Sequence, residues 1–102
     1  MKVKNMTSAN GNKIANQFII ESDNFTTFQS YESTIIVIDY SKRIIYVHPD
    51  YNYSRTTGKY RNLFFDYVGL YELNTLAKLE KAMKNKKVYI NEINSFHIET
   101  IK

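Results

Sequence analysis

The dipeptide Asn10-Gly11 is the feature that most constrains how this chain can fold. Both residue types tolerate the positive φ angles that a two-residue hairpin turn requires. The turn predicts a hairpin between a short strand near residues 3–8 and a longer strand over residues 13–21. Side chains alternate across a strand, so we expect Phe18 and Ile20 to share one face of the longer strand and to point into the core.

Three further strands are predicted before Pro49, the only proline of the chain. A turn at residues 22–24 leads into a strand over residues 25–31. Two β-branched runs, at residues 34–39 and 43–47, are separated by a short polar segment and predict a hairpin of central strands. Proline cannot donate to a β-ladder, so Pro49 ends this part of the sheet.

Two helices are predicted in the second half of the chain. Ser54 is a suitable N-cap, apolar residues recur at helical spacing from Tyr60 to Val68, and Gly69 suits the C-terminal end. Gly58 lowers the helix propensity, so we expect an irregular first turn. A second helix is predicted over residues 72–85, followed by a closing strand or hairpin at residues 88–93 and 96–101.

These elements predict one α+β domain over residues 1–102, with two helices packed on a small, mainly antiparallel sheet of four to six strands. We expect a core of apolar residues from the strands and both helices. Its predicted members are Phe18, Ile20, Ile36, Ile38, Ile45, Val47, Phe64, Leu76 and Leu79.

The sequence offers few residues for catalysis or for metal binding. It contains no cysteine, which excludes disulfides and thiolate chemistry. The two histidines, His48 and His97, do not have the spacing of a zinc motif, and the three glycines form no phosphate-binding loop. We therefore expect no enzymatic activity, no cofactor and no metal.

A His48-Asp50 pair acting on Ser54 is the one catalytic arrangement that can be drawn. The serine has no G-x-S-x-G context, and no oxyanion donors are implied. We expect His48 to bond locally at a strand end, and His97 to occupy an exposed position on a strand.

The segment from Pro49 to Phe65 has the composition of a contact surface, because it combines tyrosines, cations and hydroxyl residues. We expect Arg55, Lys59 and Arg61 to be exposed. The predicted contact patch contains Tyr51, Tyr53, Arg55, Lys59, Tyr60 and Arg61, with Lys78, Lys81 and Lys84 as a rim that steers association. In the alternative interpretation the tyrosines seal the sheet and the cations are simply solvated.

Charge is segregated along the chain, whose net charge is +4. Residues 21–40 carry acids without a cation, whereas residues 41–61 and 78–87 are basic. Such segregation favours association with an acidic partner. The chain shows no apolar run of membrane-spanning length and no hydrophobic targeting core at its N-terminus, so we expect a cytoplasmic protein with no membrane partner.

Three segments resemble a family of short uncharacterised proteins from phages and mobile elements of low-GC Gram-positive bacteria. They are N-G-N-K-I-A-N-Q-F-I-I at residues 10–20, F-Q-S-Y-E-S-T-I-I at residues 28–36 and Y-S-R-T-T-G-K-Y-R-N-L-F at residues 53–64. The family usually carries a glycine soon after the last phenylalanine, whereas here Gly69 comes later. The C-terminal third is less typical of the family, and no role is carried over to it.

The resemblance implies an accessory phage gene product that acts in the host bacterial cytoplasm. By analogy with anti-CRISPR proteins, we expect it to bind and inhibit a host defence nuclease, with a Cas9-type effector or its guide-bound complex as the partner. The alternative is a small nucleic-acid-binding or structural accessory protein of the phage. Basic residues interleaved with aromatics would suit a nucleic acid, although the net charge is modest.

Overall fold

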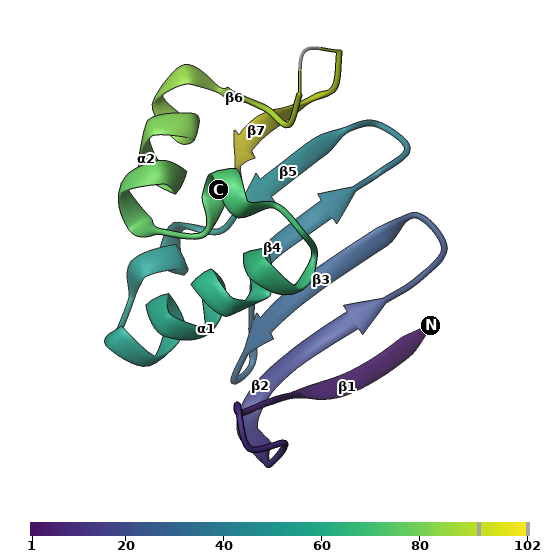
Figure 1. Ribbon diagram of the computed structural model, residues 1–102, viewed down its shortest axis with the longest axis vertical. Coiled ribbons are helices and arrows are strands. Elements are labelled where there is room, and N and C mark those ends of the chain that lie inside the picture. The colour runs from purple at the N-terminus through teal and green to yellow at the C-terminus, as the bar shows by residue number, and fades with distance from the viewer. Residues whose placement is uncertain (92, 102) are drawn as a thin grey trace.

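A computed structural model describes residues 1–91 and 93–101. The chain forms an α+β fold in which two α-helices lie together on one side of a single β-sheet, to the left of the strands in Figure 1. The strands are β1 (Lys2–Thr7), β2 (Lys13–Glu21), β3 (Phe25–Ser30), β4 (Ser33–Asp39), β5 (Ile44–Val47), β6 (Lys87–Tyr89) and β7 (Ser95–Thr100). The helices are α1 (Arg55–Tyr67) and α2 (Leu76–Asn85), each preceded by a 3-10 turn, η1 (Pro49–Asn52) and η2 (Tyr71–Leu73).

The sheet has seven strands in the order β1-β2-β3-β4-β5-β7-β6. This is one strand more than the upper limit of the four to six expected, because both closing segments join the sheet. The pairing is antiparallel except between β5 and β7, where Ile45 lies beside Ile98 in a parallel register. The helices connect these two strands, and such a crossover is what a parallel pair requires. The prediction of a mainly antiparallel sheet is confirmed.

The core lies between the helices and the sheet. Six of the predicted core residues are fully buried: Ile36, Ile38, Ile45, Val47, Phe64 and Leu79. Phe28 of β3 stacks on Phe64 of α1, with ring centroids 5.6 Å apart, so the middle of the sheet packs directly on the first helix. Each such aromatic side chain removes a large apolar area from water.

The prediction of which face of β2 points into the core is wrong. Gln17 and Ile19 are buried on one face of the strand, where Ile19 lies near α1, whereas Phe18 and Ile20 are half-buried on the opposite face. Both faces of this strand carry apolar residues, so the period of two could not decide between them. Leu76 is likewise half-buried instead of being part of the core.

The first hairpin forms as predicted, but its turn differs. β1 pairs with β2, and the loop of residues 8–12 closes with hydrogen bonds from Gly11 N to Ser8 O (2.9 Å) and from Ser8 N to Asn12 O (2.8 Å). Gly11 has a φ of +80°, while Asn10 does not have a positive φ. The loop is therefore longer than the predicted two-residue turn.

The ends of the helices follow their capping residues. Gly69 has a φ of +80°, and hydrogen bonds from Leu70 N to Phe65 O and from Gly69 N to Asp66 O close α1 in a Schellman motif. The second helix begins later than predicted, at Leu76, because the Thr75 side chain accepts a bond from Lys78 N and caps it there. Residues 71–73 form η2 instead of the first helical turn.

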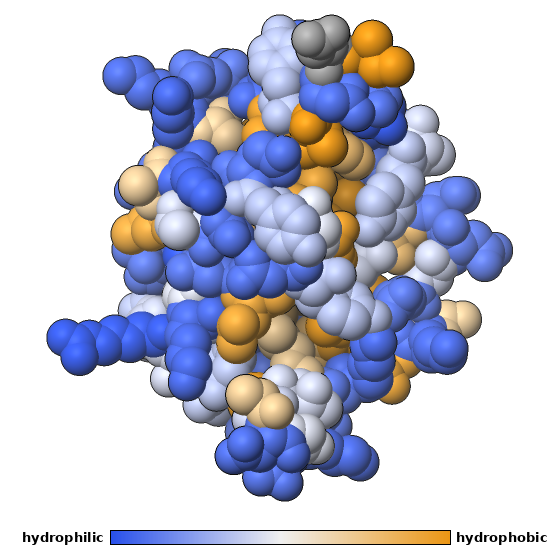
Figure 2. All heavy atoms as spheres, in the orientation of Figure 1, coloured by the Kyte–Doolittle hydropathy of each residue, from blue (hydrophilic) through white to orange (hydrophobic). Residues whose placement is uncertain are grey.

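Figure 2 shows one face of the molecule, with hydrophilic side chains around most of its outline and apolar atoms mainly in the gaps between the elements. No helix in residues 1–91 and 93–101 is long and apolar enough to cross a membrane.

Candidate partner-binding surface

The start of α1 is fixed by Ser54, as predicted. Its hydroxyl oxygen accepts a hydrogen bond from Thr57 N at 3.1 Å, which satisfies one of the free amides of the first turn. The helix begins at Arg55 and runs through Gly58 without a break, so the expected irregular first turn is wrong. The cap outweighs the low helix propensity of the glycine.

One side of this helical segment faces inward and serves the fold. Thr57 is buried, and its hydroxyl lies 3.3 Å from the hydroxyl of Ser30 on β3. Gly58 is also buried, next to the guanidinium of Arg61. The contact between Thr57 and Ser30 joins the first turn of α1 to the sheet.

Arg61 is the main correction to the predicted contact patch. Its side chain is only 1% exposed, so the prediction that it contacts a partner is wrong. Nη1 donates to the carbonyl oxygen of Tyr51 at 2.5 Å, and Nη2 donates to Asn62 Oδ1 at 2.9 Å. Burial lowers the pKa of the guanidinium, because removal from water disfavours the charged form. The arginine ties η1 to α1.

Tyr51 and Tyr60 are half-buried and pack against the core. The hydroxyl of Tyr51 donates to Glu80 Oε2 of α2 at 2.6 Å. This bond to a carboxylate raises the pKa of the Tyr51 phenol. Tyr51 therefore joins η1 to both helices.

The other side of the segment faces solvent. Tyr53 is 81% exposed, and Arg55 and Lys59 are exposed, as predicted. The ammonium of Lys59 lies 5.3 Å from the ring centroid of Tyr60, within cation–π range. We call Tyr53, Arg55 and Lys59 the docking surface. None of the three is needed to fill the core.

A hollow of about 360 Å³ adjoins the docking surface. Tyr53 lines it from one side and Tyr31 from the turn between β3 and β4, and Tyr31 is itself 55% exposed. Asp50 and Ser33 also line the hollow. A hollow lined by two tyrosines and an aspartate has the residue types that attract a cationic side chain.

The three lysines predicted as a rim are exposed on α2, but they do not lie in one cluster. Lys78 and Lys81 line an open groove between α2 and β6, where Lys84 is not a lining residue. Lys78 donates to the carbonyl oxygen of Tyr71 at 3.1 Å and to Asn74 Oδ1 at 3.0 Å. Lys84 lies in the last turn of α2, where a cation complements the helix dipole.

The sequence did not predict that three further tyrosines line the hollow and the groove. Tyr31, Tyr71 and Tyr89 are 55–64% exposed, and each lies in a turn, a 3-10 helix or an edge strand. No hydrophobic period marks such positions. The only signal was the high number of tyrosines, nine in 102 residues, which is more than a small core can bury.

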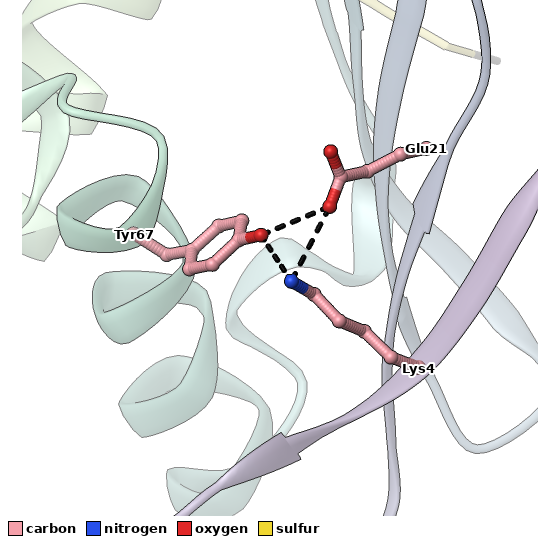
Figure 3. Close-up of polar contacts among 3 residues, drawn as sticks. All are labelled: Lys4, Glu21 and Tyr67. Atoms are coloured by element: carbon pink, nitrogen blue, oxygen red, sulfur yellow. Dashed lines mark hydrogen bonds and ion pairs between the residues drawn. The ribbon is translucent and has the colours of Figure 1, made fainter.

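A polar network at the other end of α1 was also not predicted. Tyr67 donates to Glu21 Oε1 at 2.9 Å and accepts from the ammonium of Lys4, which lies 3.4 Å from the same carboxylate (Figure 3). The bond to Tyr67 lowers the pKa of Glu21, and it raises the pKa of Lys4. The network joins the edge strand β1 to β2 and to α1.

The histidines occupy the positions expected of them. His48 Nδ1 accepts a bond from Asp50 N at 3.0 Å and thereby caps η1, whereas His97 is exposed on β7 with Nε2 3.3 Å from Glu99 Oε1. The Ser54 hydroxyl is used in the cap of α1. In the part of the chain that the structure describes, no three His, Cys, Asp or Glu residues lie close enough together to hold a metal ion.

Comparison with known proteins gives a family but no activity. The model of a family of unknown function (DUF8033) matches residues 1–82, and the chain belongs to this family. No curated protein matches the chain. No solved structure matches it either.

Proposed function

We propose that this member of the DUF8033 family is a non-enzymatic, phage-encoded accessory protein that binds and inhibits a host defence nuclease in the host bacterial cytoplasm. The proposed partner is a Cas9-type effector in its guide-bound form. The observation that carries the proposal is the exposure of Tyr53, 81%, beside Arg55 and Lys59, in a segment whose Thr57 and Arg61 are buried in the fold. Tyrosine and arginine are the residues that dominate interface energies.

The charge of the chain favours the guide-bound form of the nuclease over the empty protein. The channel of such an effector is positively charged, and it would repel a chain with a net charge of +4. Bound guide RNA supplies phosphates, which Arg55 and Lys59 could contact. The effector's own cationic side chains lie beside that RNA, and in this proposal one of them occupies the hollow that Tyr31, Tyr53 and Asp50 line.

The lysines of α2 have a lesser role in this proposal. Lys78, Lys81 and Lys84 are exposed charges, so they should change the rate of association and its salt dependence more than the final affinity.

The test measures binding of the purified protein to the empty and to the guide-bound effector. We expect tighter binding to the guide-bound form. Replacement of Arg55 or Tyr53 by alanine should cost about 1–3 kcal/mol of binding free energy, as for an interface hot spot. Lys42→Ala is the matched control, because Lys42 is an exposed cation on the β4–β5 turn. Failure to bind either form, or full affinity in the Tyr53→Ala/Arg55→Ala double variant, would remove the basis of the proposal.

A second candidate function, direct binding of nucleic acid, is favoured by a different observation. Lysines and exposed tyrosines line the groove between α2 and β6.

A further inference from the structure

The groove between η2, α2 and β6 has a volume of about 560 Å³ and is open to solvent. Tyr71 of η2 and Tyr89 of β6 line it and are 60% and 64% exposed. Lys78 and Lys81 come from α2, and Lys87 comes from β6. The fold thus brings two exposed rings and three cations together from three elements of the chain.

One cation of the groove lies over an aromatic ring, and another is hydrogen-bonded to the backbone of the second tyrosine. Lys78 donates to the carbonyl oxygen of Tyr71, which places an ammonium beside that residue. The ammonium of Lys87 lies 5.5 Å from the ring centroid of Tyr89. Glu72 is the one acidic residue among those that line the groove, so the net charge of the groove is positive. An anionic ligand with flat groups would find both kinds of contact within a short distance.

We propose that this groove binds a short segment of single-stranded nucleic acid. Bases stack on Tyr71 and Tyr89, and phosphates contact the lysines. Grooves that combine aromatic platforms with cations bind single strands in this way, because every base has a π-face. The bases of a duplex are already stacked on one another, so a duplex would use only the lysines. An acidic peptide has no bases to stack on the tyrosines, so it would also use only the lysines.

This inference does not rest on the proposed inhibition of a nuclease. It concerns η2, α2 and β6, whereas the docking surface consists of Tyr53, Arg55 and Lys59. Substitutions in the two places can therefore be tested separately.

The test uses a fluorescently labelled oligothymidylate of eight nucleotides and measures its anisotropy with the full-length chain at low salt. We expect Tyr71→Ala and Tyr89→Ala each to weaken binding by about fivefold or more, the lower end of what one base–aromatic stack contributes. Tyr89→Phe keeps the ring and should keep the affinity. Lys81→Ala should reduce the slope of log affinity against log salt by about 0.7, as expected for one phosphate contact to a single strand.

Two control variants, Tyr40→Ala and Lys42→Ala, remove an exposed tyrosine and an exposed lysine on the β4–β5 turn, outside both the groove and the docking surface, and neither should weaken oligonucleotide binding. An unlabelled duplex of the same length and an octaglutamate peptide serve as competitors, and both should compete poorly. Competition by the peptide at the concentration of the oligonucleotide would assign the groove to acidic peptides. Loss of binding in Lys81→Ala with no loss in either tyrosine variant would show attraction by charge alone. Either result, or no binding of the oligonucleotide, would overturn the proposal.

Discussion

Arg61 donates from Nη1 to the carbonyl oxygen of Tyr51 at 2.5 Å, and this bond fixes η1 against α1. Through its hydroxyl, Tyr51 also contacts Glu80, so the same tyrosine joins η1 to α2. A cation that appears in the sequence to belong to a contact surface is therefore part of the fold. The segment from Tyr53 to Arg61 divides into residues that hold α1 in place and residues that face solvent.

The first prediction compares the two arginines of this segment. Arg61→Ala leaves the Tyr51 carbonyl without its partner and removes a buried side chain, so it should lower the free energy of unfolding by about 1–3 kcal/mol. Arg55→Ala, the matched exposed change, should alter it by no more than about 0.5 kcal/mol. Urea denaturation measures both. Equal effects of the two substitutions would contradict the assignment of Arg61 to the fold.

A second prediction concerns two glycines with different reasons to be present. Gly58 has a helical conformation, and an added Cβ would lie 3.6–3.8 Å from Asn52 and Arg61, an ordinary contact distance. Gly58→Ala should therefore stabilise the protein by about 0.5–1 kcal/mol through helix propensity. Gly69 has a φ of +80°, so Gly69→Ala should destabilise it by about 1 kcal/mol or more. Thermal melting would show the opposite signs, and a loss of stability in Gly58→Ala would mean that the helix has no room for a methyl group.

The third prediction is a pH dependence that arises from Asp39. Its carboxylate accepts bonds from Ser41 N, Ser41 Oγ and Lys42 N, with the serine hydroxyl closest at 2.7 Å. The bond from the Ser41 hydroxyl, followed by that from the Lys42 amide, lowers the pKa of Asp39. A lowered folded-state pKa means that this stabilisation is complete above the unfolded pKa, about 3.9, and is lost as the pH falls through the folded value.

The difference in melting temperature between wild type and Asp39→Asn should therefore be largest at neutral pH and should shrink below about pH 4. Asp23→Asn, at an exposed turn position, is the control for the loss of one carboxylate from the surface. A difference that stays constant from neutral to acidic pH would show that the charge of Asp39 is not involved.

The fourth prediction addresses the network of Lys4, Glu21 and Tyr67. Tyr67→Phe removes the hydroxyl that bonds to both charged groups. The pKa of Glu21 should then rise toward its usual value and that of Lys4 should fall, because the Tyr67 bond is the largest cause of both shifts. Carbon-13 NMR titration of the two side chains measures this. In Tyr53→Phe, the control, both pKa values should stay as in the wild type, and unchanged values in Tyr67→Phe would disprove the coupling.

Local signals predicted much of this fold. The bounds of β2 are the predicted ones, and Ser54 and Gly69 mark the ends of α1 because capping and positive φ depend on single residues. What depends on tertiary packing could not be predicted. The alternation of residues in β2 does not show that Ile19 is buried in place of Phe18. The order of the strands, with β7 beside β5, also leaves no signal in the sequence.

The candidate surface was harder to predict than the fold. Arg55 and Arg61 are the same residue type in the same segment of the sequence. One is exposed and the other is buried, because they lie on different sides of α1. The hollow near Tyr53 and the groove near Tyr89 each combine residues from several elements. Such combinations follow from the topology, and no motif in the sequence marks them.

The most direct test of the docking surface is inhibition of target cleavage by a guide-bound Cas9-type effector, measured against increasing concentrations of this protein. The account predicts that the wild type and Lys42→Ala inhibit equally, and that Tyr53→Ala/Arg55→Ala requires at least about tenfold more protein, which corresponds to 1.4 kcal/mol. Cleavage that continues unchanged at saturating wild-type protein, or inhibition that is equally strong with the double variant, would contradict it.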